Sequence, residues 1–166
     1  MNLSSLFSKL GLSITVTQDI TLLLVLVFAS FLLGMFIGRY RLITILINIY
    51  VSFAIISVVP EKYFTDYNYK MMGFLALVIV FTLLGKKLFD IYMSGSGTGF
   101  LWRVFAMSFL EIVLIISIIL SIIPKKVALE YVSPSSYGYL ASETALFIWM
   151  IIPLILLIFI HKRINR

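Results

Sequence analysis

The chain has 166 residues, of which 62% are hydrophobic and 12% are charged, and its mean hydropathy is +1.14. Soluble domains have about 45–50% apolar and about 25% charged residues, so this composition excludes a water-soluble domain or enzyme and a disordered chain. The net charge of +6 comes from basic residues that flank apolar runs, which indicates anchoring at a membrane surface and not nucleic-acid binding. The solvent for most of this chain must be lipid.

The N-terminal residues 1–18 carry apolar side chains at helical spacing, which predicts a short helix lying on the membrane surface. Five apolar runs follow, and each is long enough, or nearly so, to cross a bilayer. We expect transmembrane spans over residues 20–38, 42–59, 67–85, 104–123 and 144–160.

Proline and polar residues mark where these runs end. Asp19 is the expected N-cap of the first span, and Pro60 and Pro124 stop the second and fourth. Pro153 lies inside the fifth run, which is expected either to span with a kink or to lie flat on the membrane. Two segments are predicted to be loops, namely the S-G-S-G-T-G joint at 94–99 and the longest connection, residues 125–143. The predicted fold is therefore an all-α polytopic membrane bundle of about five helices in one domain.

Counting lysine and arginine on each side of the five expected spans predicts the orientation, because cytoplasmic loops carry the excess. The N-terminal side has five, which are Lys9, Lys62, Lys70, Lys125 and Lys126. The opposite side has eight, which are Arg39, Arg41, Lys86, Lys87, Arg103, Lys162, Arg163 and Arg166. We therefore expect the N-terminus outside and the C-terminus in the cytoplasm, with Lys162, Arg163 and Arg166 as a basic anchor on anionic lipid.

Small residues recur every four positions in the first span, at Ser30, Gly34 and Gly38. This spacing lets two helix backbones approach closely. It is consistent with a dimerisation seam or with packing inside one bundle, and the second interpretation is favoured because a small bundle must first pack its own helices.

Glu111 is the residue that most invites a functional interpretation, because it lies eight residues into the fourth span. A carboxylate at such a depth costs about 2–3 kcal/mol unless it is protonated, paired or facing water. Counting from the same membrane face places Ser30 and Asn48 at a similar depth, so we expect a polar layer of these three residues, with Arg103 two turns away. The layer is either a proton or ion site, a partner-binding groove, or structural glue in which Glu111 bonds Asn48 or pairs with Arg103; we favour the glue.

Other chemistry finds little support in the sequence. There is no cysteine and one histidine, so a disulfide, a thiolate site or a histidine-rich metal site is excluded, and no catalytic residue, metal or cofactor is expected. The glycine-rich joint at 94–99 lacks the preceding strand of a phosphate-binding loop.

Over residues 20–124 the order of these features resembles the colicin V production protein family. The first span ends in G-M-F-I-G-R-Y-R at 34–41, similar to the family's R-G-x-x-R turn. A Gly/Ser-rich joint then precedes W-R-V-F-A, in which Arg103 matches the arginine of a D-R-x-x-G motif while Trp102 and Ala106 depart from it. Glu111 and Ile112 stand where the family carries an R-G pair, so no role of that arginine carries over. The resemblance implies a bacterial inner-membrane protein linked to peptide-toxin export or envelope maintenance.

We therefore expect a non-enzymatic subunit or scaffold of an envelope complex. Its expected partners are the lipid bilayer and other membrane or envelope proteins, a second copy of the chain among them. The alternative is a small channel or proton-coupled transporter that uses Glu111. A lipid-modifying enzyme ranks last because no cluster of acids, histidines or nucleophiles can be assembled from the sequence.

Overall fold

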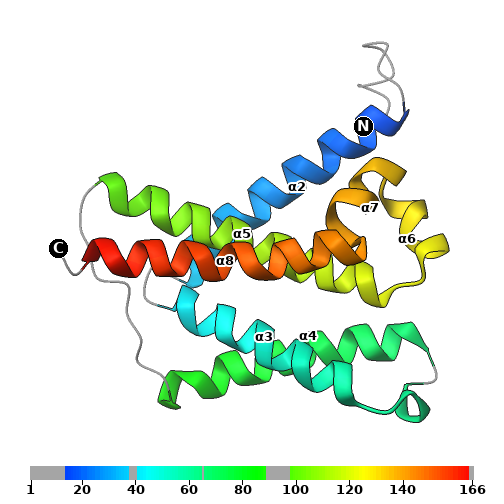
Figure 1. The fold of residues 1–166 in the computed structure, drawn as a ribbon, viewed down its shortest axis with the longest axis horizontal. Helices are drawn as coiled ribbons and strands as arrows, with labels where there is room; N and C mark the ends of the chain where they lie inside the picture. Colours follow the sequence, from blue (N-terminus) through cyan, green and yellow to red (C-terminus); the bar gives the residue numbers. More distant parts are fainter. Residues whose placement is uncertain (1–13, 38–40, 65, 89–97, 165–166) are drawn as a thin grey trace.

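The computed structural model describes residues 14–37, 41–64, 66–88 and 98–164 of the chain (Figure 1). These residues form helices and contain no strand, which confirms the predicted all-α class. In chain order the elements are α2 (Ile14–Ile37), α3 (Leu42–Val58), the 3-10 turn η1 (Glu61–Tyr63), α4 (Tyr67–Leu88), α5 (Thr98–Ile122), α6 (Lys125–Tyr131), α7 (Pro134–Ala141) and α8 (Glu143–Ile164).

Helix α5 is the central element of the bundle. It packs against α2, α3, α4 and α8 and against the short helices α6 and α7. Of its segment 101–122, 44% is buried, against 11% of the α2 segment 15–35 and 6% of the α4 segment 67–84. In Figure 1, α3 and α5 run in one direction and α2, α4 and α8 run in the other. The outer helices therefore turn most of their apolar surface away from the bundle, as a lipid environment requires.

Two apolar clusters lie on different flanks of α5. One joins α5 to α3 and α4 through residues such as Leu114, Leu46 and Phe74. The other joins α5 to α2, α6 and α7 through residues such as Val113 and Leu26. Buried residues on α5 are thus enclosed by α3 on one flank and by α2 on the other, and α8 packs along α5 as well.

Three helices, α2, α4 and α5, are long and apolar enough to cross a membrane, by length and composition. Helices α7 and α8 are bent by 53° at their junction and count as a fourth span if they are taken together. Helix α3 has 17 residues, so it is about 26 Å long at ~1.5 Å per residue, short of a ~30 Å hydrocarbon core. The described residues therefore support three or four spans, and the five expected spans are not confirmed.

The segment 125–143, expected as a loop, is largely helical. Ser133 is the N-cap of α7: its hydroxyl accepts the Ser136 backbone N–H at 3.0 Å, and Pro134 occupies the first turn. Serine at the N-cap and proline directly after it are helix-start signals, which favour a helix over a turn.

The expected N-cap at Asp19 is also wrong. Helix α2 begins at Ile14, so Asp19 lies inside the helix and its carboxylate is free to reach another element. A surface helix was predicted over residues 1–18. Residues 1–13 lie outside the described part of the structure, and residues 14–18 belong to α2. The ends at Pro60 and Pro124 are as expected, because α3 stops at Val58 and α5 at Ile122.

Pro153 lies inside α8, is fully buried, and does not end the helix. Proline has no N–H and its ring disturbs the carbonyls of the preceding turn. The Tyr50 hydroxyl of α3 donates a hydrogen bond to the Met150 carbonyl in that turn. The carbonyl that loses its helical donor is that of Trp149, four residues before the proline, so the Tyr50 bond lies at the next carbonyl and ties α3 to α8 beside Pro153.

Candidate functional site

Glu111 is completely buried on the central helix α5, with 0% of its surface exposed. Neither oxygen of its carboxyl group has a hydrogen-bond partner within the part of the chain that the structure describes. Buried side-chain polar groups are paired in the large majority of cases, so an unpaired carboxyl group requires an explanation. The group can accept a proton or bind a cation.

Ser108 lies one turn before Glu111 and is also fully buried, and its hydroxyl lacks a partner among the described residues. Its neighbour on α2 is Gly34, where a Cβ atom would lie 3.2 Å from the Ser108 Oγ and 3.7 Å from the Val104 Cγ1. The contact shows that Gly34 packs against α5 of the same chain. Any substitution at Gly34 must push against the helix that carries Glu111.

Ser30 lies one turn before Gly34 on α2 and is fully buried. Its hydroxyl donates to the Val27 carbonyl of its own helix at 2.7 Å. Because α2 and α5 are antiparallel and Gly34 meets Ser108, Ser30 lies at about the level of Glu111. The expected similar depth of Ser30 and Glu111 thus agrees with the helix register.

Asn48 on α3 is 5% exposed, and its Nδ2 donates to the Thr82 Oγ1 of α4 at 3.4 Å. It does not bond Glu111. Ser52, one turn further along α3, is fully buried and its hydroxyl has no partner within the described ranges. The Asn48 side chain therefore points to α4, and the expected Glu111–Asn48 hydrogen bond is absent.

Arg103 begins the buried part of α5 and is half-buried, two turns from Glu111. The Glu111 oxygens accept no hydrogen bond from it in the described structure. Of the two pairings expected for structural glue, neither forms a hydrogen bond to the carboxyl group. Gly38 and Arg166, together with the side chains of Lys162 and Arg163, lie outside the described part of the structure, so the basic anchor stays a prediction.

A second acid, Asp19 of α2, has hydrogen-bond partners, unlike Glu111. Its Oδ1 accepts hydrogen bonds from the hydroxyls of Ser133 and Ser136, the latter at 2.6 Å. Both serines lie at the N-terminus of α7, where the helix dipole also favours a negative charge. This junction was not predicted from the sequence, although Ser133 and Pro134 form a helix-start signal that is visible there.

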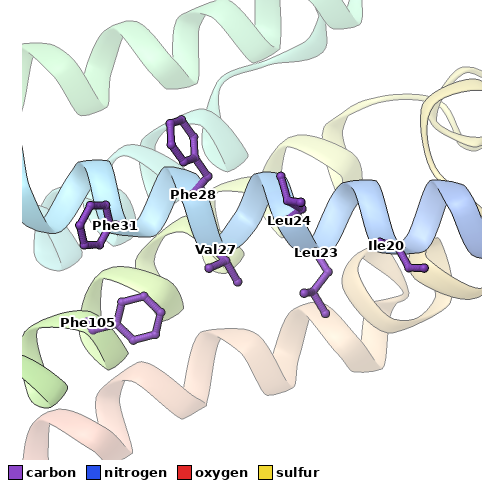
Figure 2. Close-up of a pocket in the computed structure, with 7 residues that line it drawn as sticks. All are labelled: Ile20, Leu23, Leu24, Val27, Phe28, Phe31 and Phe105. Carbon is purple, nitrogen blue, oxygen red and sulfur yellow. The ribbon is translucent and has the colours of Figure 1, made fainter. Parts of the chain in front are cut away.

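An open apolar groove of about 580 Å³ lies along the outer face of α2 (Figure 2). Phe105 of α5 flanks it, and the other lining residues follow the helical repeat of α2: Ile20, Leu23, Leu24, Val27, Phe28 and Phe31. Phe28 is 60% exposed and Phe31 is 55% exposed, so large aromatic side chains face outwards here. Such a surface suits a lipid chain or another apolar helix.

The described residues contain no group of three or more His, Asp or Glu side chains that could hold a metal ion. No protein-family model, curated protein or solved structure matches the chain. Within the described residues, the fold and the site together define an all-helical protein with helices long and apolar enough to cross a membrane and one fully buried carboxyl group without a hydrogen-bond partner.

Proposed function

We propose that the protein is a non-enzymatic, multi-pass protein of the bacterial inner membrane that takes up and releases a proton at Glu111. The observation that supports this is the complete burial of Glu111 together with the lack of a hydrogen-bond partner for either carboxyl oxygen in the described structure. Ionisable groups inside membrane proteins are expensive and are commonly found on ion and proton pathways.

Two features favour a proton over a structural role. Structural glue needs a hydrogen bond or an ion pair, and the described neighbours provide no hydrogen bond to the carboxyl group. A partner protein docking from outside cannot pair a side chain with no exposed surface unless the bundle first rearranges. A proton needs no coordination cage, and it removes the charge that burial penalises.

The test is proton flux in reconstituted vesicles that contain a pH-sensitive dye. Glu111→Gln keeps the size and polarity of the side chain but cannot titrate, so we expect an assembled protein without flux. Glu143→Gln is the matched control, because Glu143 is an exposed acid at the start of α8, and it should keep the wild-type flux. Equal flux from wild type and Glu111→Gln would overturn the proposal.

A second candidate function, a subunit or scaffold of an envelope complex, is favoured by the apolar groove on α2. Its occupant would be a transmembrane helix of another envelope protein involved in toxin export or envelope maintenance, or of a second copy of this chain. Under this hypothesis Phe31→Ser should release a stoichiometric partner in mild detergent. Met35→Ser is the control, since Met35 is 65% exposed on α2 but does not line the groove. A wild-type protein that purifies alone would refute it.

For the orientation we propose the N-terminus outside and the C-terminus in the cytoplasm, from the excess of basic residues on one side. The chain has no cysteine, so single introduced cysteines report their own side. Ser135→Cys, exposed on α7, should react with an impermeant thiol reagent on intact spheroplasts. Arg41→Cys, exposed before α3, should react only after permeabilisation. The reverse pattern would invert the topology.

A further inference from the structure

The side chains that enclose Glu111 differ in size between the α3 side and the α2 side. Towards α3 the core of α5 is closed by large side chains that are at most 2% exposed, which are Leu42, Ile45, Leu46 and Ile49. Towards α2 the facing residues near Glu111 are Ser30 and Gly34. On the α3 side an opening would break this packed apolar core. On the α2 side the residues level with Ser108 and Glu111 are small, and the nearest buried large side chain is Leu26, one turn from Ser30.

A smaller share of α2 than of α5 is buried. Only 11% of its segment 15–35 is buried, against 44% for α5, and its outer face is apolar along the groove. Leu26 packs it against Val113 of α5, and two further contacts attach it to the bundle. One is the close contact of Gly34 with Ser108, and the other is the pair of hydrogen bonds from Ser133 and Ser136 to Asp19. The two attachments lie about four turns apart on the helix.

We propose that α2 is the movable cover of the Glu111 site and that the Asp19–Ser133–Ser136 junction is its latch. When α2 separates from α5 at Gly34, the first polar groups uncovered are the unpartnered Ser108 hydroxyl and, one turn further, the Glu111 carboxyl group. When α2 closes, Glu111 is sealed from both sides. This inference rests on the proposed function, because it names how the same carboxyl group is reached.

The Gly34–Ser108 contact permits a direct test of the cover. A Cβ atom at Gly34 would lie 3.9 Å from the Ser108 Cβ, within the ~3.5–4.5 Å that a disulfide requires. Because the chain has no cysteine, Gly34→Cys combined with Ser108→Cys would create one defined cross-link between α2 and α5. Oxidation locks the cover, and a reductant releases it.

The measurement is the rate at which a membrane-permeant carbodiimide labels Glu111 in the reconstituted full chain, followed by mass spectrometry of the α5 peptide. We expect oxidation of the double variant to slow this labelling by about tenfold or more, because labelling then needs an opening that the cross-link prevents. Reductant should restore the rate. The two single-cysteine variants under the same oxidant are the controls and should not slow. Equal rates in the locked and released states would overturn the proposal.

The latch provides a second test that requires no cross-link, should the double variant fail to fold. Asp19→Ala removes the acceptor of both serine hydroxyls, so α2 should open more often and Glu111 should label several-fold faster. Asp66→Ala is the matched control: Asp66 also accepts hydrogen bonds, from Asn68 at the start of α4, but it lies away from α2. Labelling of Glu111 that is unchanged by Asp19→Ala would contradict the latch.

The outcomes separate this inference from the proposed function. Carbodiimide labelling reports access to Glu111 whether or not protons are transported. If flux survives Glu111→Gln, the proposed function fails while the labelling result still decides whether α2 covers the residue. If flux is lost in Glu111→Gln but the lock does not affect labelling, the function stands and the cover is wrong.

Discussion

Asp19 and Glu111 are two acids in apolar helices of the same bundle, and their surroundings differ in every respect. Asp19 lies near the N-terminal end of α2 and accepts hydrogen bonds from two serine hydroxyls at the start of α7. Glu111 is in the middle of α5, is fully buried, and has no hydrogen-bond partner in the described residues. A carboxylate that accepts hydrogen bonds contributes to stability, whereas a buried one without partners costs stability.

The difference does not come from a shortage of hydroxyl groups near Glu111. Ser108 lies one turn away and Ser30 lies at about the same level on α2, but Ser108 has no described partner and Ser30 bonds its own helix at the Val27 carbonyl. At Asp19 the serines belong to a cap, where helix geometry aims them at an acceptor outside the helix. Hydroxyl groups are therefore useful to an acid only where local structure directs them.

We expect the largest effects on stability when each of the two acids is replaced with leucine. Asp19→Leu loses two hydrogen bonds to a charged acceptor and should lower the free energy of unfolding by about 3 kcal/mol. Glu111→Leu loses no described hydrogen bond and should raise it by about 1–3 kcal/mol while abolishing proton flux. Denaturation in mixed detergent micelles measures both. A destabilised Glu111→Leu variant would show that Glu111 has a stabilising partner, and the contrast between the two acids would be refuted.

A smaller effect is expected where α2 packs over α5. Gly34→Leu places a large side chain where even a Cβ would approach the Ser108 Oγ to 3.2 Å, so it should destabilise the bundle by about 2 kcal/mol. Met35→Leu introduces the same side chain at the next position, which is 65% exposed, and should be almost neutral. Thermal melting of the two variants in one detergent compares them; equal melting temperatures would remove the close-packing argument.

We expect the smallest effects on stability when single serine hydroxyls near the two acids are removed. Ser133→Ala removes both the cap of α7 and a hydrogen bond to Asp19, so we expect a loss of about 1–2 kcal/mol. Ser108→Ala removes a hydroxyl without a described partner and should change stability by less than about 0.5 kcal/mol. A cost at Ser108 as large as that at Ser133 would mean that the Ser108 hydroxyl is bonded after all.

Much of the helix layout could be predicted from the sequence. Runs of uncharged apolar residues predicted the positions of five helices, which are α2, α3, α4, α5 and α8. Pro60 and Pro124 predicted where α3 and α5 end. Both signals depend only on residues that are neighbours in the sequence. Glu111 was also identified as unusual, since a charge within an apolar run is visible without a structure. The depth that it shares with Ser30 followed from counting turns along straight helices.

What failed depended on partners distant in the sequence. Asn48 bonds Thr82, not Glu111, because the rotation of α3 about its axis decides which neighbour the side chain meets. Asp19 looked like a local cap, but its partners lie more than 110 residues away in a segment expected to be a loop. That segment was misjudged because serine, proline and glycine are typical of both turns and helix starts, and only the order Ser133–Pro134 favours the helix.

The hydrogen bond from Tyr50 to the Met150 carbonyl has a consequence for biogenesis. The two residues are 100 positions apart, and a ribosome adds about 5–20 residues per second. About 5–20 s therefore pass after the synthesis of Tyr50 before its acceptor on α8 has been synthesised. The α3–α4 hairpin, which carries its own Asn48–Thr82 hydrogen bond, can form during that interval. Docking of α8 is then the closing step of assembly, and a chain truncated before Met150 leaves the Tyr50 hydroxyl without that acceptor.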